Sequence, residues 1–429
     1  MNPLRRRKQK MPWHKHTDVS HFHHPNQRIS QTILSSRGRV IKTQQTRVQA
    51  LISHAIGGCA FGMHHCDIYN SMPTNLARKV ALGAAALFVI PSALAQQATQ
   101  TLLATPATVA WGFYSAQAKP VLTVKSGDTV RIQTLSTCGP RQRLEALGIA
   151  SADIPAYVDD IYKNYPAADK GPGGHILTGP VAIDGAEPGD VLEIRIQKID
   201  IDVPWACNSF GAGRGFLPND FPYSHSRLIP LDRTKMIGHF ARGIDIPLHP
   251  FFGSMGIATA SGGKYDSAPP WMHGGNMDNK ELVAGTTIYL PVNSKGANFE
   301  VGDGHAGQGN GEVDITALET QLTGTFQFVV HKGDLNDPHR LVWPRAETPT
   351  QYISMGFDLD LKTATEMAIR NMITFLSEQN PDHPHISRED AYALVSVACD
   401  VDITQLVDTK SGVHVMCPKA LFTTPTTTH

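Results

Sequence analysis

Short apolar runs separated by turn residues direct this chain toward a fold rich in β-strands. Residues 121–124 and 129–134 flank a Ser-Gly-Asp turn, and two further runs within 175–196 flank the turn 187–190. Short apolar runs bounded by Gly, Pro and Asp are typical of strands joined by turns. Further strands are predicted at 286–292, 324–331 and 350–356. We therefore predict an α+β, β-rich fold in which mixed β-sheets pack as a sandwich or barrel, with a few helices.

Four helices and one long loop are predicted around these strands. Residues 141–147 and 155–163 are short helical candidates, whereas 361–378 carries one apolar stripe at helical spacing and 388–399 follows it. Residues 204–230 are aromatic, Gly- and Pro-rich and lack periodicity, which predicts a long surface loop.

A weak repeat occurs within the predicted strands. Pro180 and Val181 precede Gly185 at the same spacing as Pro291 and Val292 precede Gly296. An internal duplication is one interpretation of this echo. The chain carries no GxGxxG after a strand, no Walker loop and no heptads, so nucleotide-binding and coiled-coil classes are not favoured.

The leader, residues 1–71, is basic and differs in composition from the rest of the chain. Residues 1–71 hold eleven Lys or Arg against two Asp and show little hydrophobic periodicity. Residues 72–95 contain Arg78 and Lys79, then an apolar run, and end in Ala-Leu-Ala. This pattern predicts a signal peptide that is cleaved after Ala95, with a buried helix as the alternative. We expect a periplasmic or secreted protein with no membrane attachment after cleavage.

Residues 1–71 then precede a predicted signal peptide, so we interpret them as disordered or as a start assigned too early, with Met72 the true start. A histidine-rich metal-binding tail is the alternative. Residues 96–119 are Ala-, Thr- and Gln-rich and predict a loose lead-in, and residues 120–422 form the predicted domain. The acidic balance after residue 95 disfavours nucleic acid as a partner.

Four cysteines lie after the predicted cleavage site: Cys138, Cys207, Cys399 and Cys417. Export permits disulfides, but the spacing leaves the pairing open. No CxxC pair is present, so a cysteine-based zinc site is not expected. Cys138 precedes Gly-Pro and is either a structural cysteine or a nucleophile.

Two glycine-rich polar clusters, 273–278 and 302–312, flank the predicted strand 286–292. Asp303 and His305 are spaced i, i+2, which places both side chains on one face of an extended segment. The surrounding glycines allow Glu312 to join them. A histidine with carboxylates suits a zinc-like ion. His273 and Asp278 of the first cluster, and His175 after Gly-Gly, are candidates to complete or flank this site.

Five motifs occur in order across most of the chain after residue 120. They are His175-x-Leu-Thr-Gly-Pro with Gly185–Asp190, Gly253–Ala258, Gly274–Asp278, Leu290–Val292 with Gly296-Ala297, and Gly302–Glu312. In these motifs, and in 391–400 and 418–422, the chain resembles the acetamidase/formamidase family. It departs from the family at Asn310, where Asp is usual, and in its secretory signal. The resemblance implies hydrolysis of a short linear amide, or of a lactam in some relatives, with a divalent metal such as zinc.

The resemblance also suggests roles for the candidate residues. Asp303 and His305 would bind the metal, with Asp278 or His175 completing its shell. Glu312 is the candidate general base, or else a ligand, because a carboxylate can take a proton from water and pass it to the departing nitrogen. The remaining candidates hold the developing oxyanion or line the pocket: Asn276, Gly274, Gly275, Ser254 and His273.

Two other functions stay open at this point. An exported small-molecule-binding module without catalysis is suggested by Asn310 and by the loop 204–230. Cys138-based amidase chemistry is the third hypothesis, and it predicts inactivation by thiol alkylation. The expected partner of the metal-dependent enzyme is a small amide, and a homo-oligomer is compatible with the sequence.

Overall fold

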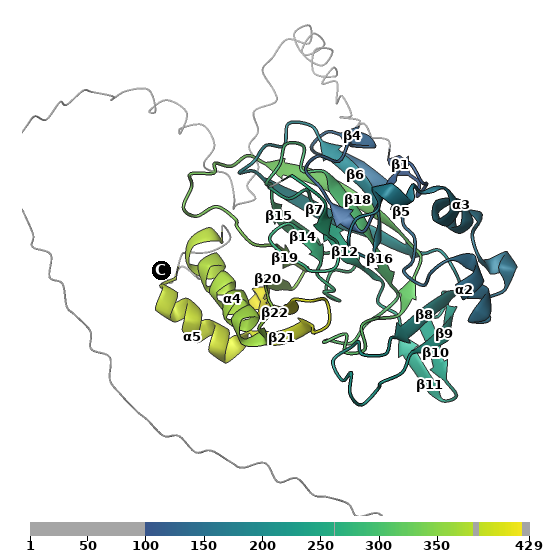
Figure 1. Cartoon of the computed structure of the whole chain (residues 1–429). Coiled ribbons are helices and arrows are strands. Elements are labelled where there is room, and N and C mark those ends of the chain that lie inside the picture. Colours follow the sequence, from purple (N-terminus) through teal and green to yellow (C-terminus); the bar gives the residue numbers. More distant parts are fainter. Residues whose placement is uncertain (1–98, 261, 381–385, 423–429) are drawn as a thin grey trace, which may run out of the picture. The chain divides into compact units, whose positions relative to one another are not determined.

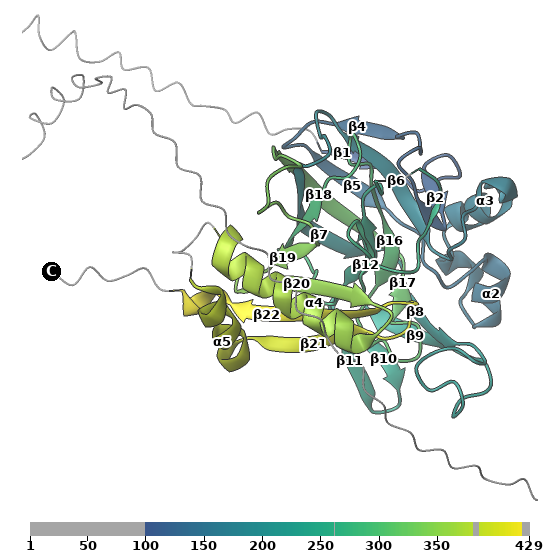
Figure 2. The same ribbon diagram turned by 60° about the vertical axis from the view of Figure 1, so that its left-hand side comes forward.

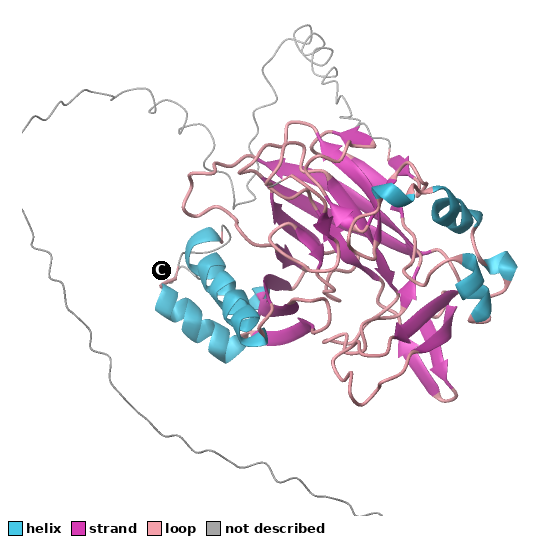
Figure 3. Cartoon of the chain, viewed as in Figure 1, coloured by secondary structure: helices cyan, strands magenta, loops and turns pink. Residues whose placement is uncertain are grey.

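The computed structural model describes residues 99–260, 262–380 and 386–422 (Figure 1). The predicted leader 1–71 and signal peptide 72–95 lie outside these residues. Most described secondary structure is β, in two large sheets and one small sheet (Figure 3). The β-rich α+β prediction is therefore confirmed. None of the helices among the described residues has both the length and the apolar character needed to span a bilayer.

The first sheet has nine strands. Its order is β1 (Gln100–Leu102), β5 (Thr129–Gln133), β18 (Leu322–His331), β7 (Val191–Ile201), β15 (Thr287–Pro291), β19 (Arg345–Glu347), β20 (Gln351–Asp358), β22 (Ser411–Pro418) and β21 (Asp400–Gln405). β1 and β5 are parallel, and the other neighbours are antiparallel. The strands predicted at 324–331 and 350–356 are β18 and β20.

The second sheet has eleven strands and carries the glycine-rich clusters. Its main path is β11 (Ile244–Pro247), β10 (Ile237–Ala241), β9 (His225–Asp232), β8 (Trp205–Phe210), β17 (Glu319–Thr320), β16 (Phe299–His305), β12 (Phe251–Gly256) and β14 (Gly274–Asn276). From this path β16 also pairs with β6 (Ile176–Ile183), which pairs with β2 (Val109–Trp111) and β4 (Leu122–Val124). The small sheet joins β3 (Phe113–Tyr114) to β13 (Tyr265–Asp266).

The main core lies between the two large sheets, as the alternation of apolar side chains predicts. Phe252 and Phe299 of the second sheet meet Phe326 and Phe328 of the first, with ring centroids 5.1–5.6 Å apart. These side chains are fully buried. The core therefore fixes the second sheet, and its polar clusters, against a rigid apolar layer.

The helices pack at the margins of the sheets (Figure 2). α2 (Arg141–Ala146) and α3 (Ala156–Asn164) follow β5, and α4 (Leu361–Thr374) and α5 (Arg388–Ala398) pack against β20 and β22. Asp360 caps α4 by accepting from the Thr363 amide at 2.9 Å, and Ser387 caps α5 through the Asp390 amide at 3.0 Å. The short turns are 3₁₀ at Ser151–Asp153, Ala167–Asp169 and Lys419–Leu421, with a π turn at Phe375–Gln379.

Two predictions about irregular segments are wrong. Residues 100–114, expected within a loose lead-in, form β1, β2 and β3, because Trp111, Phe113 and Tyr114 are buried against the sheets. The expected loop 204–230 contains β8 and most of β9, which pair from Trp205 to Phe210. Its Gly and Pro residues concentrate in the connection 211–224, and the average composition concealed the strands on either side.

The two echo segments meet in the structure. The Ile183 amide donates to the Gly296 carbonyl at 2.9 Å, and the Gly296 amide donates to the Ala186 carbonyl at 2.8 Å. Gly185 and Gly296 share a positive φ, 77° and 78°. The two turns thus pair with each other, and an internal duplication stays a prediction.

Candidate active site

Pairing between four strands aligns the centre of the site. Phe251 of β12 lies opposite His305 of β16, His305 lies opposite Glu319 of β17, and Glu319 lies opposite Cys207 of β8. Residues that are directly opposite in neighbouring strands project from the same face of a sheet. His305 Nε2 accordingly lies 3.2 Å from Glu319 Oε1, and both side chains are buried.

Asp303 extends this row along β16. Its Oδ2 lies 3.4 Å from His305 Nε2 and 3.7 Å from His175 Nε2. The Nδ1 atom of His175 is 3.0 Å from the Ser267 hydroxyl, which orients the ring. The same-face prediction for Asp303 and His305 is therefore confirmed, although 302–305 belong to a strand and not to a loop.

The other edge of the His305 ring faces a second group of donors. His305 Nδ1 lies 3.0 Å from Gln308 Oε1 and 4.0 Å from Asp278 Oδ1. Gln308 Nε2 donates to the Asp278 carbonyl at 2.8 Å, and Asn276 Nδ2 donates to Asp278 Oδ2 at 2.7 Å. Glu312 completes this group, since donor atoms of Asp278, His305 and Glu312 lie within 4.8 Å of one another.

Asp408 approaches from the tip of the β21–β22 hairpin and hydrogen-bonds to Asp278. We name Asp278, Asp303, Glu312, Glu319 and Asp408 the carboxylate cluster. The hairpin tip is fixed beside Glu312, because the Gly311 amide donates to Thr404 O and the Leu406 amide donates to Gly311 O, each at 3.0 Å.

Three members of the carboxylate cluster have left-handed backbone: Asp278 at φ 48°, Asp303 at φ 57° and Glu312 at φ 42°. This conformation is uncommon outside glycine, and sparsely populated backbone costs about 1–3 kcal/mol per residue. Such strained backbone persists only where the surrounding structure holds it in place, and it is concentrated at functional sites.

Gly253 of β12 leaves the space into which these groups point. A Cβ at this position would lie 2.4 Å from Asp278 Oδ1, 2.5 Å from Asp303 Oδ2 and 2.9 Å from His305 Cε1. The site therefore contains a small volume bounded by two carboxylate oxygens and an imidazole, which only glycine keeps open.

Burial and mutual repulsion raise the pKa of most of the carboxylate cluster. Burial, with Glu312 and Asp408 nearby, raises the pKa of Asp278 well above its usual value. Burial and Asp408 do the same for the pKa of Glu312. Burial raises the pKa of Asp408 to about 6, although the hydrogen bond with Asp278 opposes the shift. His305 lowers the pKa of Asp278 and of Asp408, but burial and repulsion between the carboxylates outweigh it.

The other side of His305 is charge-paired. Burial would raise the pKa of Asp303, but His175 and His305 lower it to about 2. Burial would lower the pKa of His305, but Glu319 and Asp303 raise it well above its usual value. The site therefore has one half, at Asp303, in which opposite charges are paired, and another half, at Asp278, in which burial and repulsion between carboxylates dominate.

The donor set fits a divalent cation. Several buried atoms have no hydrogen-bond partner: Asp278 Oδ1, His305 Nε2, Glu312 Oε2 and Asp408 Oδ2. Buried polar groups normally find partners, so unpaired oxygens and an imidazole nitrogen that face one space indicate a ligand. Two sets converge on His305, one with Asp278 and Glu312 and one with Asp303 and Glu319. Carboxylate oxygens with one histidine suit zinc or manganese.

Several candidate residues from the sequence lie elsewhere. The Gly274 amide donates to Trp271 O at 3.0 Å, so it is not available as an oxyanion donor. His273 packs edge-on against Tyr114, and burial lowers its pKa to about 4. Ser254 lies on β12 and bonds to the Tyr114 hydroxyl at 2.9 Å. Gly275 is buried on β14, where it pairs with Met255.

Asn276 and Asn310 differ in their distance from the carboxylates. Asn276 reaches Asp278 with its amide nitrogen and therefore orients a carboxylate, instead of leaving that N–H for an oxyanion. Asn310 is exposed and donates to Asp402 at 3.3 Å, outside the carboxylate cluster. The departure from the family at Asn310 thus removes no carboxylate from this site.

Sequence reasoning missed three contributors, Glu319, Asp408 and Tyr114, whereas Gln308 and Gly253 lie within the motifs that it singled out. Burial raises the pKa of the Tyr114 phenol well above its usual value, with Asp303 and Asp278 adding to the shift, so it stays neutral. A strand pairing between 305 and 319 would have found Glu319. Asp408 had no local signal, because a hairpin distant in sequence delivers it.

Cys138 is not a free thiol. Cys138 and Cys207 form a disulfide, and Cys399 and Cys417 form another. The hypothesis of a Cys138 nucleophile is therefore wrong, because a disulfide sulfur has no thiolate to offer.

A cavity of about 720 Å³ opens beside the site, with Gln308 and Glu312 in its wall. The remaining wall is largely apolar and includes Phe240, Ile246, Val283 and Leu318, with His249 and Lys280 among its polar groups. Glu312 thus lies between the donors around His305 and a space of ligand size.

A model of the Acetamidase/Formamidase family matches residues 114–263 and 261–424. The chain belongs to the acetamidase/formamidase family. A formamidase from Methylophilus methylotrophus is 27% identical to this chain over 274 residues, which cover 48% of this chain and 67% of that protein. An acetamidase from Mycolicibacterium smegmatis is 29% identical over 202 residues, which cover 33% of this chain and 49% of that protein. The matches thus span about half to two thirds of these relatives.

Solved structures of this acetamidase/formamidase family share the fold. An acetamidase from Bacillus halodurans superposes with a TM-score of 0.62 at 26% identity, over 75% of this chain and 98% of that one. An acetamidase from Yersinia enterocolitica gives a TM-score of 0.62 at 27% identity, over 77% and 94%. The likeness covers nearly the whole of those two chains.

Proposed function

We propose that this chain hydrolyses the amide bond of a small linear amide, releasing ammonia and a carboxylate. The observation that carries the proposal is the buried donor set around His305, which opens through Glu312 onto the cavity. Membership of a family whose named members include a formamidase and an acetamidase supports the reaction class. Amides with a short acyl group are the proposed substrates.

We propose a divalent cation, zinc or a similar ion, at His305. Asp303, His305 and Glu319 form one candidate ligand set, His175 adjoins it, and Asp278 lies across the imidazole. A bound ion would supply a Lewis acid that polarises the amide carbonyl and makes water more acidic. Asn276 and Gln308 would hold Asp278 in place, as hydrogen bonds from surrounding residues do for metal-binding carboxylates.

Glu312 is the proposed general base. It borders the cavity, its Oε2 has no hydrogen-bond partner, and its pKa is raised by burial and by Asp408. A carboxylate with a raised pKa can take a proton from water and return it to the departing nitrogen at neutral pH.

Glu312→Gln tests this role. The amide keeps the shape and removes the base, so we expect kcat to fall about 10²–10⁴-fold while the metal content stays at the wild-type level. Metal content is measured by elemental analysis of dialysed protein, and Glu389→Gln on α5, an exposed glutamate away from the cavity, serves as the surface control. Loss of the metal together with activity would reassign Glu312 as a ligand, and full activity would exclude both roles.

The deciding experiment is ammonia release from formamide, acetamide and a small lactam. The assay is repeated after a chelator treatment and again after zinc is restored. We expect activity to disappear and return with the metal. Activity that is insensitive to the chelator contradicts the cation, and no release from any amide by metal-loaded protein favours the binding-module hypothesis.

Export remains part of the proposal. The pattern at 72–95 is that of a signal peptide, and the described residues contain two disulfides, which persist in oxidising compartments. Cell fractionation of the tagged protein tests periplasmic or secreted localisation. A protein that is retained in the cytoplasm with an uncleaved N-terminus would contradict it.

A further inference from the structure

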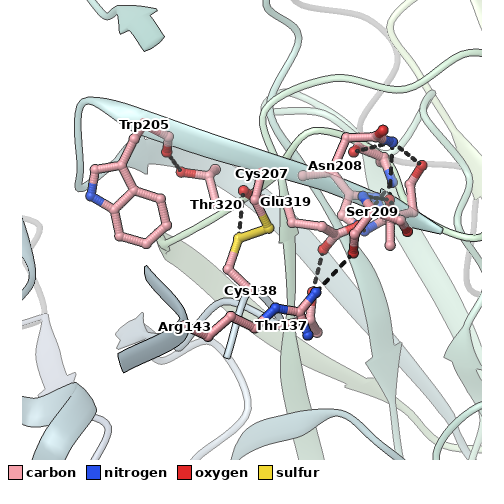
Figure 4. Close-up of a disulfide and its surroundings, with 12 residues drawn as sticks. Thr137, Cys138, Arg143, Trp205, Cys207, Asn208, Ser209, Glu319 and Thr320 are labelled. Carbon is pink, nitrogen blue, oxygen red and sulfur yellow. Dashed lines mark hydrogen bonds and ion pairs between the residues drawn. A yellow bond between two sulfur atoms is a disulfide. The ribbon is translucent and has the colours of Figure 1, made fainter. Parts of the chain in front are cut away.

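The Cys138–Cys207 disulfide lies beside Glu319, one of the candidate donors around His305 (Figure 4). Cys207 is the register partner of Glu319 in the sheet, and Cys138 Sγ is 3.4 Å from the Glu319 carbonyl oxygen. Both cysteines are 1% exposed. The disulfide therefore ties the segment after β5 to β8, the strand that pairs with β17 at Glu319.

Thr137, the residue before this disulfide, holds the Glu319 carboxylate itself. Its hydroxyl donates to Glu319 Oε2 at 2.6 Å. The other oxygen, Oε1, accepts from the Ala317 amide at 2.9 Å and lies 3.2 Å from His305 Nε2. Both oxygens of Glu319 are thus constrained, and the carboxylate is turned toward His305.

Leu135 and Cys138 on either side of Thr137 pack in a hydrophobic cluster, but the backbone between them makes few hydrogen bonds. Before Thr137, the last hydrogen bonds to the sheet are those that Thr134 donates to Leu322 O. After Thr137, Arg143 of α2 donates to the Ser209 hydroxyl at 3.2 Å. Between them, within the part of the chain described, the backbone amides of 135–139 donate to no other backbone carbonyl. The covalent link at Cys138 is therefore the nearest anchor of the Thr137 hydroxyl.

We propose that Thr137 and the Cys138–Cys207 disulfide are positioning elements for Glu319, on which the cation affinity of the His305 donor set depends. The inference rests on the proposed function, because Glu319 is one of its candidate ligands. Residues that orient a metal-binding carboxylate typically change metal affinity by about 10–100-fold when they are removed.

The first test compares Thr137→Val with Thr137→Ser. Valine keeps the shape and removes the donor, whereas serine keeps the hydroxyl. We expect the zinc Kd of chelator-stripped protein, measured by competition with a chelating dye, to rise about 10-fold or more in Thr137→Val and to stay near wild type in Thr137→Ser. Thr320→Val is the matched control, because Thr320 adjoins Glu319 but donates to Trp205 O at 2.7 Å (Figure 4).

The second test removes each disulfide in turn. Cys138→Ala/Cys207→Ala should raise the zinc Kd, whereas Cys399→Ala/Cys417→Ala should not. The control disulfide joins the open end of the β21–β22 hairpin, opposite the tip that carries Asp408. Both variants are compared below their unfolding temperatures, which thermal melts followed by circular dichroism establish.

Each outcome decides the proposal. Thr137→Val with the wild-type zinc Kd would overturn it, even if the disulfide variant fails to fold. A Kd that rises equally in Thr320→Val would reduce the effect to general loosening of β17 and also overturn it. A wild-type protein that binds neither zinc nor manganese but releases ammonia from amides would remove the cation and this inference together, while leaving amide hydrolysis intact.

Discussion

At the scale of one residue, Gly253 shows how the absence of a side chain leaves space for the candidate site. It sits on a central strand among fully buried neighbours, where a larger residue would ordinarily improve packing. Its α-carbon instead faces Asp278, Asp303 and His305. A glycine in a strand interior often marks the close approach of a ligand, and three donor groups around this one agree with that reading.

Gly253→Ala should therefore abolish cation binding. The new methyl group would lie within 2.4–2.9 Å of two carboxylate oxygens and an imidazole carbon, and the buried side chains cannot move away freely. We expect no zinc binding by dye competition and no ammonia release. Gly174→Ala is the control, because its Cβ meets no atom within 4 Å. Zinc binding by Gly253→Ala with the wild-type Kd would place the cation elsewhere.

For single residues, the sequence predicts only contacts between side chains that are a few positions apart in the chain. The i, i+2 spacing brought Asp303 to His305, since an extended strand dictates it. Glu319 and Asp408 were missed because strand register and hairpin packing place them, and no local pattern encodes either. The Cys138 hypothesis failed for the same reason, because its partner Cys207 is 69 residues away.

At the scale of elements, the β21–β22 hairpin has a role beyond the sheet edge. It delivers Asp408 to Asp278 and hydrogen-bonds to the loop that carries Glu312. His414 is fully buried on β22 and its Nδ1 lies 2.7 Å from the Thr404 hydroxyl of β21, so this contact joins the two strands. Burial, with Lys280 nearby, lowers the pKa of His414 to about 4.

Stability should fall below pH 6.5 because of this histidine. The unfolded chain binds the proton near pH 6.5, whereas folded His414 binds it only near pH 4, so the native state loses stability as pH falls between these values. From pH 7 to pH 5 the loss is about 2 kcal/mol. Urea unfolding of wild type and His414→Gln measures it, and the variant should show a smaller loss. An equal loss in both proteins would contradict the assignment.

The helices and most strands were predictable because their signals are local. The apolar stripe of α4 and the turn residues between β4 and β5 lie within a few positions of each other. The strands in 100–114 and 204–230 were not, because their aromatic residues become strand-forming only when another sheet strand covers them.

At the scale of the whole molecule, most polar side chains of the candidate site come from one of the two packed sheets. The first sheet and the phenylalanine core behind it supply rigidity, and the second sheet and its loops carry the donors apart from Asp408, which comes from the β21–β22 hairpin of the first sheet. The hairpin β10–β11 contributes Phe240 and Ile246 to the cavity wall. At about 720 Å³, this cavity is far larger than formamide requires.

Linear amides with longer acyl chains should therefore be better substrates. Each methylene that enters an apolar wall contributes up to about 0.8 kcal/mol, or roughly 4-fold in kcat/KM. Within the short linear amides proposed as substrates, we expect kcat/KM to increase from formamide through acetamide to butyramide, and Ile246→Trp to remove the increase while formamide turnover persists. A steady decrease with chain length in the wild type would show that the cavity does not hold the acyl group.

The left-handed backbone at Asp278, Asp303 and Glu312 has a practical consequence for mutagenesis. Alanine at these positions removes a charge and also places a β-carbon without a compensating polar group in an unfavourable conformation, so lost activity would have two causes. Asparagine tolerates this backbone better than alanine, and glycine relieves it. A series of Asn, Gln and Gly replacements therefore separates chemistry from conformation, which an alanine scan of these three residues would confound.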